Sequence, residues 1–261
     1  MIPLKIYRTW KNIYLPDNYQ KAWNYTQINN PQFTQVLYTD DHIYHFLNKH
    51  YKNHSLWKSD VYDAYYKINP NYHAARADLF RYALIYEKGG VYMDIKSAAN
   101  NITELVRNKN TLLYSPWEIT SLFRFFSMFS LNFRYGEFQQ WWFAAPPKNN
   151  ILKNVITEVV NNINNYKYNG SYEKCQYMRK RLGNGIFSYL LFLDSDCISF
   201  DTFEITGPYV FTRTIMNAHK SYPLSANGNN KMIYDFSGDH RIDDSYLKDA
   251  YWNKGSPLVL H

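Results

Sequence analysis

The chain has 261 residues, a hydrophobic fraction of 46% and a formal net charge of +7. This length is enough to bury a sizeable core, and a single domain is the natural expectation. The hydrophobic fraction is that of an ordinary globular protein. Basic residues are scattered along the chain, and the run Arg179-Lys180-Arg181 is too short to indicate nucleic-acid binding. We therefore expect no nucleic-acid partner.

Signals for membrane insertion or export are weak in this sequence. Residues 1–6 lack the apolar segment of a signal peptide, and no window reaches the roughly 18 apolar residues of a spanning helix. The two cysteines, Cys175 and Cys197, form no motif, which fits a reducing compartment. We expect a cytoplasmic protein. The most apolar stretch, residues 122–133 (LFRFFSMFSLNF), is interpreted either as core or lid packing or as a contact with a membrane surface or the acceptor.

Strand and helix patterns alternate along the first part of the chain. Hydrophobic periodicity, proline positions and polar capping residues mark where each element begins and ends. The predicted elements in order are a strand over residues 5–10, a helix from Pro16, a strand over 33–38, a helix from Thr39 or Asp40 toward residue 50, and a helix over 59–67.

The remaining pattern continues this alternation. Gly89 is a suitable end for the preceding helix, because glycine tolerates the left-handed conformation. The predicted elements are a helix over residues 74–88, strands over 91–95 and 138–145, a helix with an apolar face from Leu152 to Ile163, and a helix from about Tyr209. The alternation predicts an α/β fold with a mainly parallel sheet.

Open sheets of this kind bind ligands beyond the carboxyl ends of their strands. Trp10, Tyr38 and Asp94 fall at predicted strand ends, so we expect them to converge on one crevice. Asp78 and Arg81 are three residues apart on a helix and share a face. Each of these residues also has a simpler interpretation: a surface ion pair for Asp78 and Arg81, a turn cap for Asp94, and core packing for Trp10.

The segment that joins this helix to the following strand resembles a known family. The string ARADLFRYALIYEKGGVYMDIK is similar to the sugar-binding DXD region of glycosyltransferase family 32. The opening IPLKIYRTWKNIYLP resembles the family's IPKIIHQTWK start, and NPQFTQVLYTDD resembles its NPDYEYKLWTDED. Later, ITGPYVFTRTI is similar to its TGP segment. The resemblance covers residues 1–97 in order and returns near residues 206–215.

The resemblance implies a GT-A fold and a retaining transfer from a nucleotide-sugar. By position, Trp10 would lie against the nucleobase, and Asp78 and Arg81 would contact donor-sugar hydroxyls with Arg76 beside them. Tyr92 and Asp94 would hold the ribose and nearby donor atoms. A flat indole face suits a base, and a carboxylate with a guanidinium suits vicinal hydroxyls.

The chain departs from the family at one position. The second DXD aspartate is expected to bind Mn²⁺ or Mg²⁺, and here that position is Lys96. A protonated ammonium has no lone pair for a metal, but it neutralises phosphate directly. Three interpretations stay open: the lysine replaces the metal, the site is degenerate, or a metal is held elsewhere. For a metal held elsewhere, the candidate ligands lie in the loop SGDHRIDDSYLKDAYW: Asp239, His240, Asp243 and Asp244. In the same loop, Trp252 would stack on the donor. The alternative interpretation of this loop is a solvated acidic segment.

The sequence therefore predicts a single GT-A domain over residues 1–261, with the nucleotide-sugar part in residues 1–100 and the acceptor side and C-terminal loop in residues 101–261. The predicted activity is transfer of a hexose from a UDP- or GDP-sugar to a glycan or glycolipid, with Asp94 and Lys96 as catalytic residues and attack from the leaving-group face. Two alternatives remain: a nucleotide-sugar-binding module without turnover, and a scaffold for other glycosylation enzymes.

Overall fold

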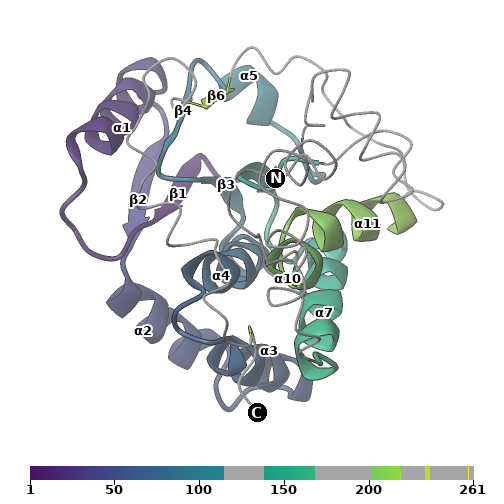
Figure 1. The fold of residues 1–261 in the computed structure, drawn as a ribbon. Helices are drawn as coiled ribbons and strands as arrows, with labels where there is room; N and C mark the ends of the chain where they lie inside the picture. Colours follow the sequence, from purple (N-terminus) through teal and green to yellow (C-terminus); the bar gives the residue numbers. More distant parts are fainter. Residues whose placement is uncertain (115–137, 168–200, 219–232, 236–257, 259–261) are drawn as a thin grey trace, which may run out of the picture.

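The computed structural model describes residues 1–114, 138–167, 201–218, 233–235 and 258. In these residues, a four-stranded sheet of order β2-β1-β3-β5 lies at the centre, with helices around it (Figure 1). Strand β1 pairs in parallel with β2 and β3, whereas β5 is antiparallel to β3. The predicted α/β architecture with a mainly parallel sheet is confirmed. The strands are β1 (Lys5–Thr9), β2 (Thr34–Tyr38), β3 (Gly90–Met93) and β5 (Trp142–Ala145).

The other elements surround this sheet. A short antiparallel pair joins β4 (Ser97–Ala99) to β6 (Ile233–Asp235). None of the helices in the described ranges is long and apolar enough to cross a bilayer. The helices are α1 (Asp17–Asn29), α2 (Asp40–His50), α3 (Leu56–Lys67), α4 (His73–Lys88), α5 (Thr103–Val106), α7 (Asn150–Asn164), α10 (Asp201–Ile205) and α11 (Pro208–Ala218).

Most predicted boundaries agree with the structure to within one residue. Thr39 caps α2 through a reciprocal capping box with His42. Helix α3 begins three residues earlier than predicted, at Leu56. Strand β3 ends at Met93, before the predicted residue 95, because residues 94–97 form a turn in which the Ser97 amide donates to the Asp94 carbonyl (2.9 Å). The strand predicted over 138–145 is regular only over β5.

The sheet separates two hydrophobic cores, because successive side chains along a strand point to opposite faces. Tyr7, Tyr92 and Phe143 lie in the larger core, together with residues of α2, α3, α4, α7 and α11. Ile6 and Val91 lie in the smaller core on the other face, which α5 helps to close. Every strand of the central sheet except the edge strand β2 therefore contributes to both cores.

Two glycines make the sharp connection from α4 to β3. Gly89 has φ 63° and ψ −178°, a region that is open essentially only to glycine. A Cβ atom there would lie 2.6 Å from Cδ of Pro147, and one on Gly90 would lie 2.9 Å from the Lys5 carbonyl oxygen. The connection sends α4 back along β3, so the N-terminal half of α4 reaches the carboxyl ends of β1 and β3.

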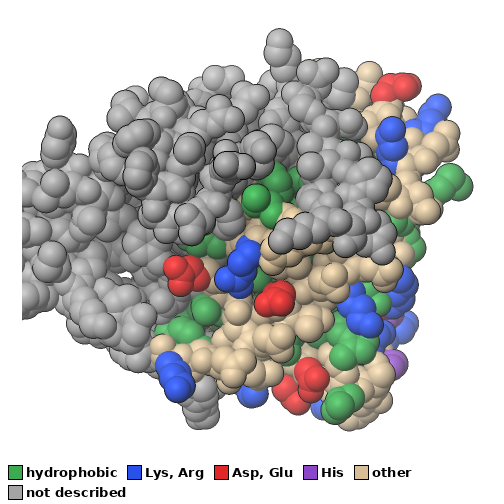
Figure 2. All heavy atoms as spheres, turned by 90° about the vertical axis from the view of Figure 1, so that its right-hand side faces the viewer, with side chains coloured by type: hydrophobic (Ala, Val, Ile, Leu, Met, Phe, Trp, Pro, Cys, Tyr) green, Lys and Arg blue, Asp and Glu red, His purple; other side chains and the backbone are tan. Residues whose placement is uncertain are grey.

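Charged side chains are distributed over the surface. Figure 2 shows the face on the right-hand side of Figure 1, where acidic and basic groups of the described residues are interspersed. Several predictions fall outside the described residues and stay predictions: those on residues 122–133, Cys175, Cys197, Asp239, His240, Asp243, Asp244 and Trp252.

Candidate functional site: a buried charge cluster at the strand ends

The site lies at the point in the sheet where the chain, after adding strands on one side of β1, adds them on the other. The chain moves from β1 to β2 on one side and reaches β3 on the other, and Tyr7 pairs with Tyr92 in register. The carboxyl ends of β1 and β3 therefore lie side by side, followed by Trp10 and Asp94. Such a switch point is where open α/β sheets bind ligands.

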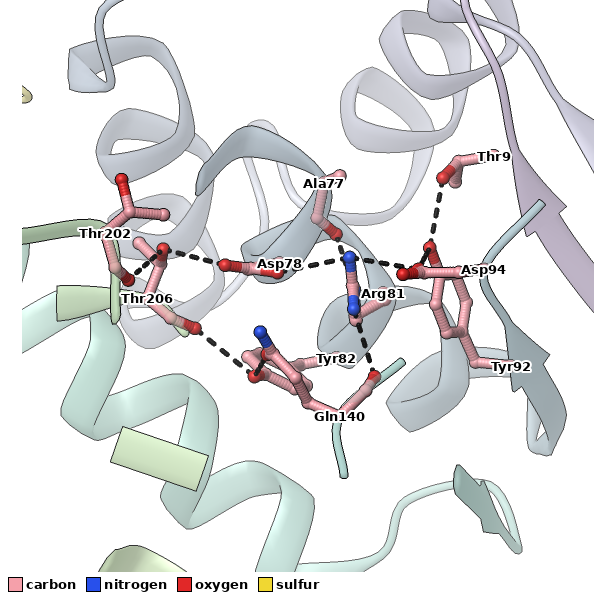
Figure 3. Close-up of polar contacts among 10 residues, drawn as sticks. All are labelled: Thr9, Ala77, Asp78, Arg81, Tyr82, Tyr92, Asp94, Gln140, Thr202 and Thr206. Carbon is pink, nitrogen blue, oxygen red and sulfur yellow. Dashed lines mark hydrogen bonds and ion pairs between the residues drawn. The ribbon is translucent and has the colours of Figure 1, made fainter. Parts of the chain in front are cut away.

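Arg81 lies at the centre of the site, between two carboxylates (Figure 3). Its Nη2 is 3.1 Å from Asp78 Oδ1 and 3.2 Å from Asp94 Oδ1. Its Nη1 donates to the Gln140 carbonyl (3.0 Å), and its guanidinium lies 4.7 Å from the centre of the Tyr92 ring. The predicted helix pair and the strand-end carboxylate thus form one buried cluster, not a solvated surface ion pair.

Neighbouring hydroxyl groups hold both carboxylates in place. The Tyr92 hydroxyl donates to Asp94 Oδ1 (3.0 Å) and lies 3.1 Å from Thr9 Oγ1. On the other side, the Thr206 hydroxyl donates to Asp78 Oδ2 (3.0 Å). A continuous polar chain therefore runs from the end of β1 to the segment between α10 and α11 (Figure 3).

Burial dominates the electrostatics of this cluster. It raises the pKa of Asp78 to about 7, against the opposing effect of Arg81; Asp94 adds to the rise, and the Thr206 hydrogen bond reduces it. Burial alone would lower the pKa of Arg81, but Asp94, Tyr92 and Asp78 hold it well above its usual value. One permanent cation is therefore shared by two carboxylates, which leaves carboxylate oxygens with capacity for further hydrogen bonds.

Asp94 is the member of the cluster that faces outward. Its side chain is 15% exposed, whereas those of Asp78 and Arg81 are buried. Its Oδ1 takes the bonds from Arg81 and Tyr92, and among the described residues nothing bonds to its Oδ2. This oxygen is the natural place for a ligand hydroxyl to bind.

Two of the residues predicted at the crevice point elsewhere. The Arg76 guanidinium donates to the Ile68 carbonyl (3.1 and 2.8 Å) and lies over the Tyr65 ring, so the expectation that it accompanies Asp78 and Arg81 is wrong. On a helix, residue 76 faces away from both. The Tyr38 ring packs among core aromatic residues, although its carbonyl accepts from the Trp10 amide (3.0 Å).

Trp10 and Lys96 both lie beside the cluster. The Trp10 ring is half-buried and meets Tyr19 edge-on, with centroids 5.0 Å apart, so core packing and contact with a base are both compatible with its position. Lys96 is half-buried in the turn that follows β3, two residues beyond Asp94. The strand β6 ends at Asp235, which pairs with Ser97, so the C-terminal part of the chain returns to this turn.

The sequence reasoning missed Arg8, which lies under the same turn. Its Nη1 donates to the carbonyl groups of Asp94 (3.0 Å), Ile95 (3.2 Å) and Ser97 (2.6 Å). Its Nη2 and Nε donate to Thr26 Oγ1 and Gln35 Oε1. The sequence could have indicated Arg8, because an arginine within an otherwise buried strand requires special partners for its charge. Thr206, also missed, lies in the quoted TGP segment.

The described residues do not fit a divalent ion at this turn. Such ions prefer several carboxylate and carbonyl oxygens, but Arg81 engages Asp94 Oδ1, which leaves only Oδ2 of that carboxylate, and Arg8 takes the carbonyls of Asp94, Ile95 and Ser97. Lys96 replaces the second acid. Within the described residues, no group of three or more histidine, cysteine, aspartate or glutamate side chains is arranged to hold a metal.

Comparison with known proteins places this geometry in context. Residues 16–112 match the family model described as the glycosyltransferase sugar-binding region containing a DXD motif. This stretch is therefore similar to such a sugar-binding region, with Lys96 in the place of the motif's second aspartate. It includes α4, β3 and the turn after β3, so the resemblance predicted from the sequence is confirmed there.

Curated relatives of the chain are yeast enzymes. The chain is 30% identical over 115 residues to inositol phosphoceramide mannosyltransferase 3 of Schizosaccharomyces pombe, which covers 44% of this chain and 28% of the relative. It is 25% identical over 158 residues to inositol phosphoceramide mannosyltransferase 1 of the same yeast, and this match covers 59% of this chain and 42% of the relative. The chain thus spans less than half the length of these relatives.

Solved structures support the fold. The glycosyltransferase domain of the YGT toxin, solved with UDP bound, superposes with a TM-score of 0.54 at 9% identity, covering 97% of this chain and 87% of that domain. At this identity the likeness concerns the fold alone. The predicted GT-A fold is confirmed.

Proposed function

We propose that this protein is a retaining glycosyltransferase that moves a hexose from a UDP- or GDP-sugar to a glycan or glycolipid acceptor. The observation that carries the proposal is the Asp78–Arg81–Asp94 cluster, which lies at the switch point of a GT-A sheet within a DXD sugar-binding region. Buried carboxylates and a guanidinium match the donor and acceptor pattern of sugar hydroxyls. The names of the yeast relatives favour mannose and an inositol phosphoceramide type of acceptor.

The proposed roles follow from position. Asp94 Oδ2 accepts from a donor hydroxyl at the outer side of the cluster, and Arg81 holds Asp94 and Asp78 at a fixed separation. Trp10 packs beside Ile95 of the turn, and its proposed role is to cover the base with its indole face. Departure of the nucleoside diphosphate requires stabilisation of negative charge, which fixed cations near the turn supply.

A panel of UDP- and GDP-sugars tests the proposal. The purified protein is expected to hydrolyse one donor slowly and to transfer its sugar when a glycan or glycolipid acceptor is added. The anomeric configuration of the product, measured by nuclear magnetic resonance, decides whether the transfer is retaining. A protein that binds none of the donors, and releases neither UDP nor GDP, would contradict the proposal.

A second candidate is a nucleotide-sugar-binding module without turnover. The observation that favours it is Lys96 in the place of the second acid of the motif. This module would bind a donor, and its melting temperature would rise with donor concentration, but no sugar would be released. Binding without hydrolysis or transfer would therefore select this alternative.

A further inference from the structure

Arg8 is a buried cation that forms no ion pair with an acidic side chain among the described residues. It comes from the sheet face opposite to α4 and has no exposed surface. Every hydrogen bond of its guanidinium to the described residues goes to a carbonyl, a hydroxyl or an amide oxygen. Burial lowers its pKa to about 10, so the side chain is still charged at neutral pH. A buried charge that is held by neutral oxygens is costly to keep, which indicates a use for it.

The contacts of Arg8 determine how the turn over residues 94–97 is oriented. The carbonyl groups of Asp94 and Ile95 point inward to Nη1. In a trans peptide group the N–H points opposite to the carbonyl, and the described residues contain no cis peptide. The N–H groups of Ile95 and Lys96 are therefore directed away from Arg8, toward the outer side of the turn. Successive outward N–H groups form an anion-binding concavity.

A divalent ion would meet the opposite arrangement. It would need several oxygen ligands, but Arg8 already takes three backbone carbonyls, Asp94 Oδ2 is one ligand only, and Lys96 brings a like charge to the same turn. An anion, by contrast, would meet two peptide N–H groups and the positive charges that Lys96 and Arg8 bring to this turn. The groups of this turn that do not fit a divalent ion therefore fit a phosphate.

We propose that the turn over residues 94–97 is a metal-independent seat for the diphosphate of a nucleotide donor, with Arg8 as its positioning residue and Lys96 as its contacting cation. This inference rests on the proposed function, because it concerns the same donor. It adds that fixed charges, one below the turn and one on it, take the place of the divalent ion.

Calorimetric titration of UDP and GDP, each with EDTA and with Mn²⁺, tests the proposal. Uridine and guanosine serve as probes without phosphate. We expect the unaltered protein to bind one diphosphate equally well in EDTA and in Mn²⁺. Arg8→Gln and Lys96→Gln should each lower that affinity about tenfold while the nucleoside affinity stays within about twofold, since only the phosphate contact is lost. Arg8→Lys keeps the charge and should lose less affinity than Arg8→Gln.

The control is Lys153→Gln, which removes one positive charge from an exposed side chain at the start of α7. It should leave the affinity unchanged, which separates a local effect from a change of net charge. If Arg8→Gln does not fold in a thermal melt, Lys96→Gln decides the outcome alone, since the Lys96 side chain is only partly buried and lies in a turn.

The outcomes separate this inference from the proposed function. Loss of diphosphate binding in EDTA, unchanged binding in Lys96→Gln, or equal losses in Arg8→Lys and Arg8→Gln would each overturn the inference while leaving a nucleotide-binding enzyme. Absence of UDP and GDP binding under all conditions would overturn the proposed function and this inference with it.

Discussion

The two ends of helix α4 carry ion clusters with opposite charge balance. At its N-terminal half, one guanidinium, Arg81, serves the two carboxylates of Asp78 and Asp94. At its C-terminal end, one carboxylate, Glu87, is paired with two lysines: Lys58 at 2.8 Å and Lys148. The same helix thus has an excess of acid beside the strand ends and an excess of base at the opposite edge of the sheet.

The two clusters shift the pKa of their carboxyl groups in opposite directions. Burial raises the pKa of Asp78 to about 7, because a single shared cation does not compensate for it. Burial also acts to raise the pKa of Glu87, but hydrogen bonds from Lys148 and Lys58 reverse the shift and lower it. In the Glu87 cluster, two lysines offset a single carboxylate. The Asp78 cluster has unused hydrogen-bonding capacity, which is typical of a binding site.

The largest expected effect is a loss of turnover when the Asp94 cluster is altered, but not when the Glu87 cluster is altered. Asp94→Asn keeps the shape of the side chain and removes its charge, so donor hydrolysis and transfer should fall on the order of 1000-fold. The melting temperature should change little. Glu87→Gln, at the other end of α4, is the matched control and should keep its turnover. Measurement of UDP or GDP release by both folded variants makes the comparison, and full turnover by Asp94→Asn would remove Asp94 from the site.

The next largest effect is a loss of stability when the glycine connection between α4 and β3 is altered. Gly89→Ala introduces a Cβ 2.6 Å from Pro147 Cδ at a glycine-only backbone conformation. The free energy of unfolding should fall by about 3 kcal/mol. Ala74→Gly, in the first turn of α4, is the control and should cost about 1 kcal/mol. Urea titration measures both. A cost for Gly89→Ala no larger than that of the control would mean that the connection tolerates a side chain.

The pH dependence of stability should have opposite signs at the two ends. Asp78 holds its proton more tightly in the folded protein, so its contribution is complete below about pH 4 and is lost as the pH rises toward 7. Glu87 has a lowered pKa, so its contribution is present above its ordinary value of 4.5 and is lost as the pH falls below it. Each dependence has a slope of at most about 1.4 kcal/mol per pH unit.

Two isosteric variants measure this difference. The destabilisation caused by Asp78→Asn should shrink as the pH rises from 4 to 7, because the wild-type protein loses stability over that range. The destabilisation caused by Glu87→Gln should instead grow as the pH rises from about 3 to 6. Chemical denaturation at a series of pH values gives both curves. Curves of the same sign would show that the charge balance of the two clusters is not the cause.

The smallest effect tests how the acidic cluster is oriented. Thr206→Val removes the hydroxyl that donates to Asp78 Oδ2 and should lower the free energy of unfolding by about 1–2 kcal/mol. It should also raise the donor KM more than it lowers kcat. Thr206→Ser keeps the hydroxyl and should restore both values. Failure of the serine variant to restore the donor KM would assign Thr206 a packing role only.

The fold was largely predictable because its signals are local. Helix α4, Gly89 and β3 follow each other within a few residues, and periodicity, a glycine cap and a β-prone run indicate each of them. Asp78, Arg81 and Asp94 were brought together by the same continuity. Arg76 was placed wrongly because proximity in sequence does not determine which face of the helix a side chain occupies. Its guanidinium binds Ile68, on the α3 side.

The sequence by itself determined the succession of the longer strands and helices, the family resemblance and the substitution of Lys96 in the motif, but not the short elements β4, α5, α10 and β6. Those features depend on residues that are close in the chain. Only the tertiary structure decided that Arg8 lies under the turn, 86 residues before Asp94, and that Thr206 bonds to Asp78, 128 residues away. Hydrogen bonds over such separations depend on how strands pair and helices pack. No local pattern records them, and they set both the orientation of the turn and the charge of the site.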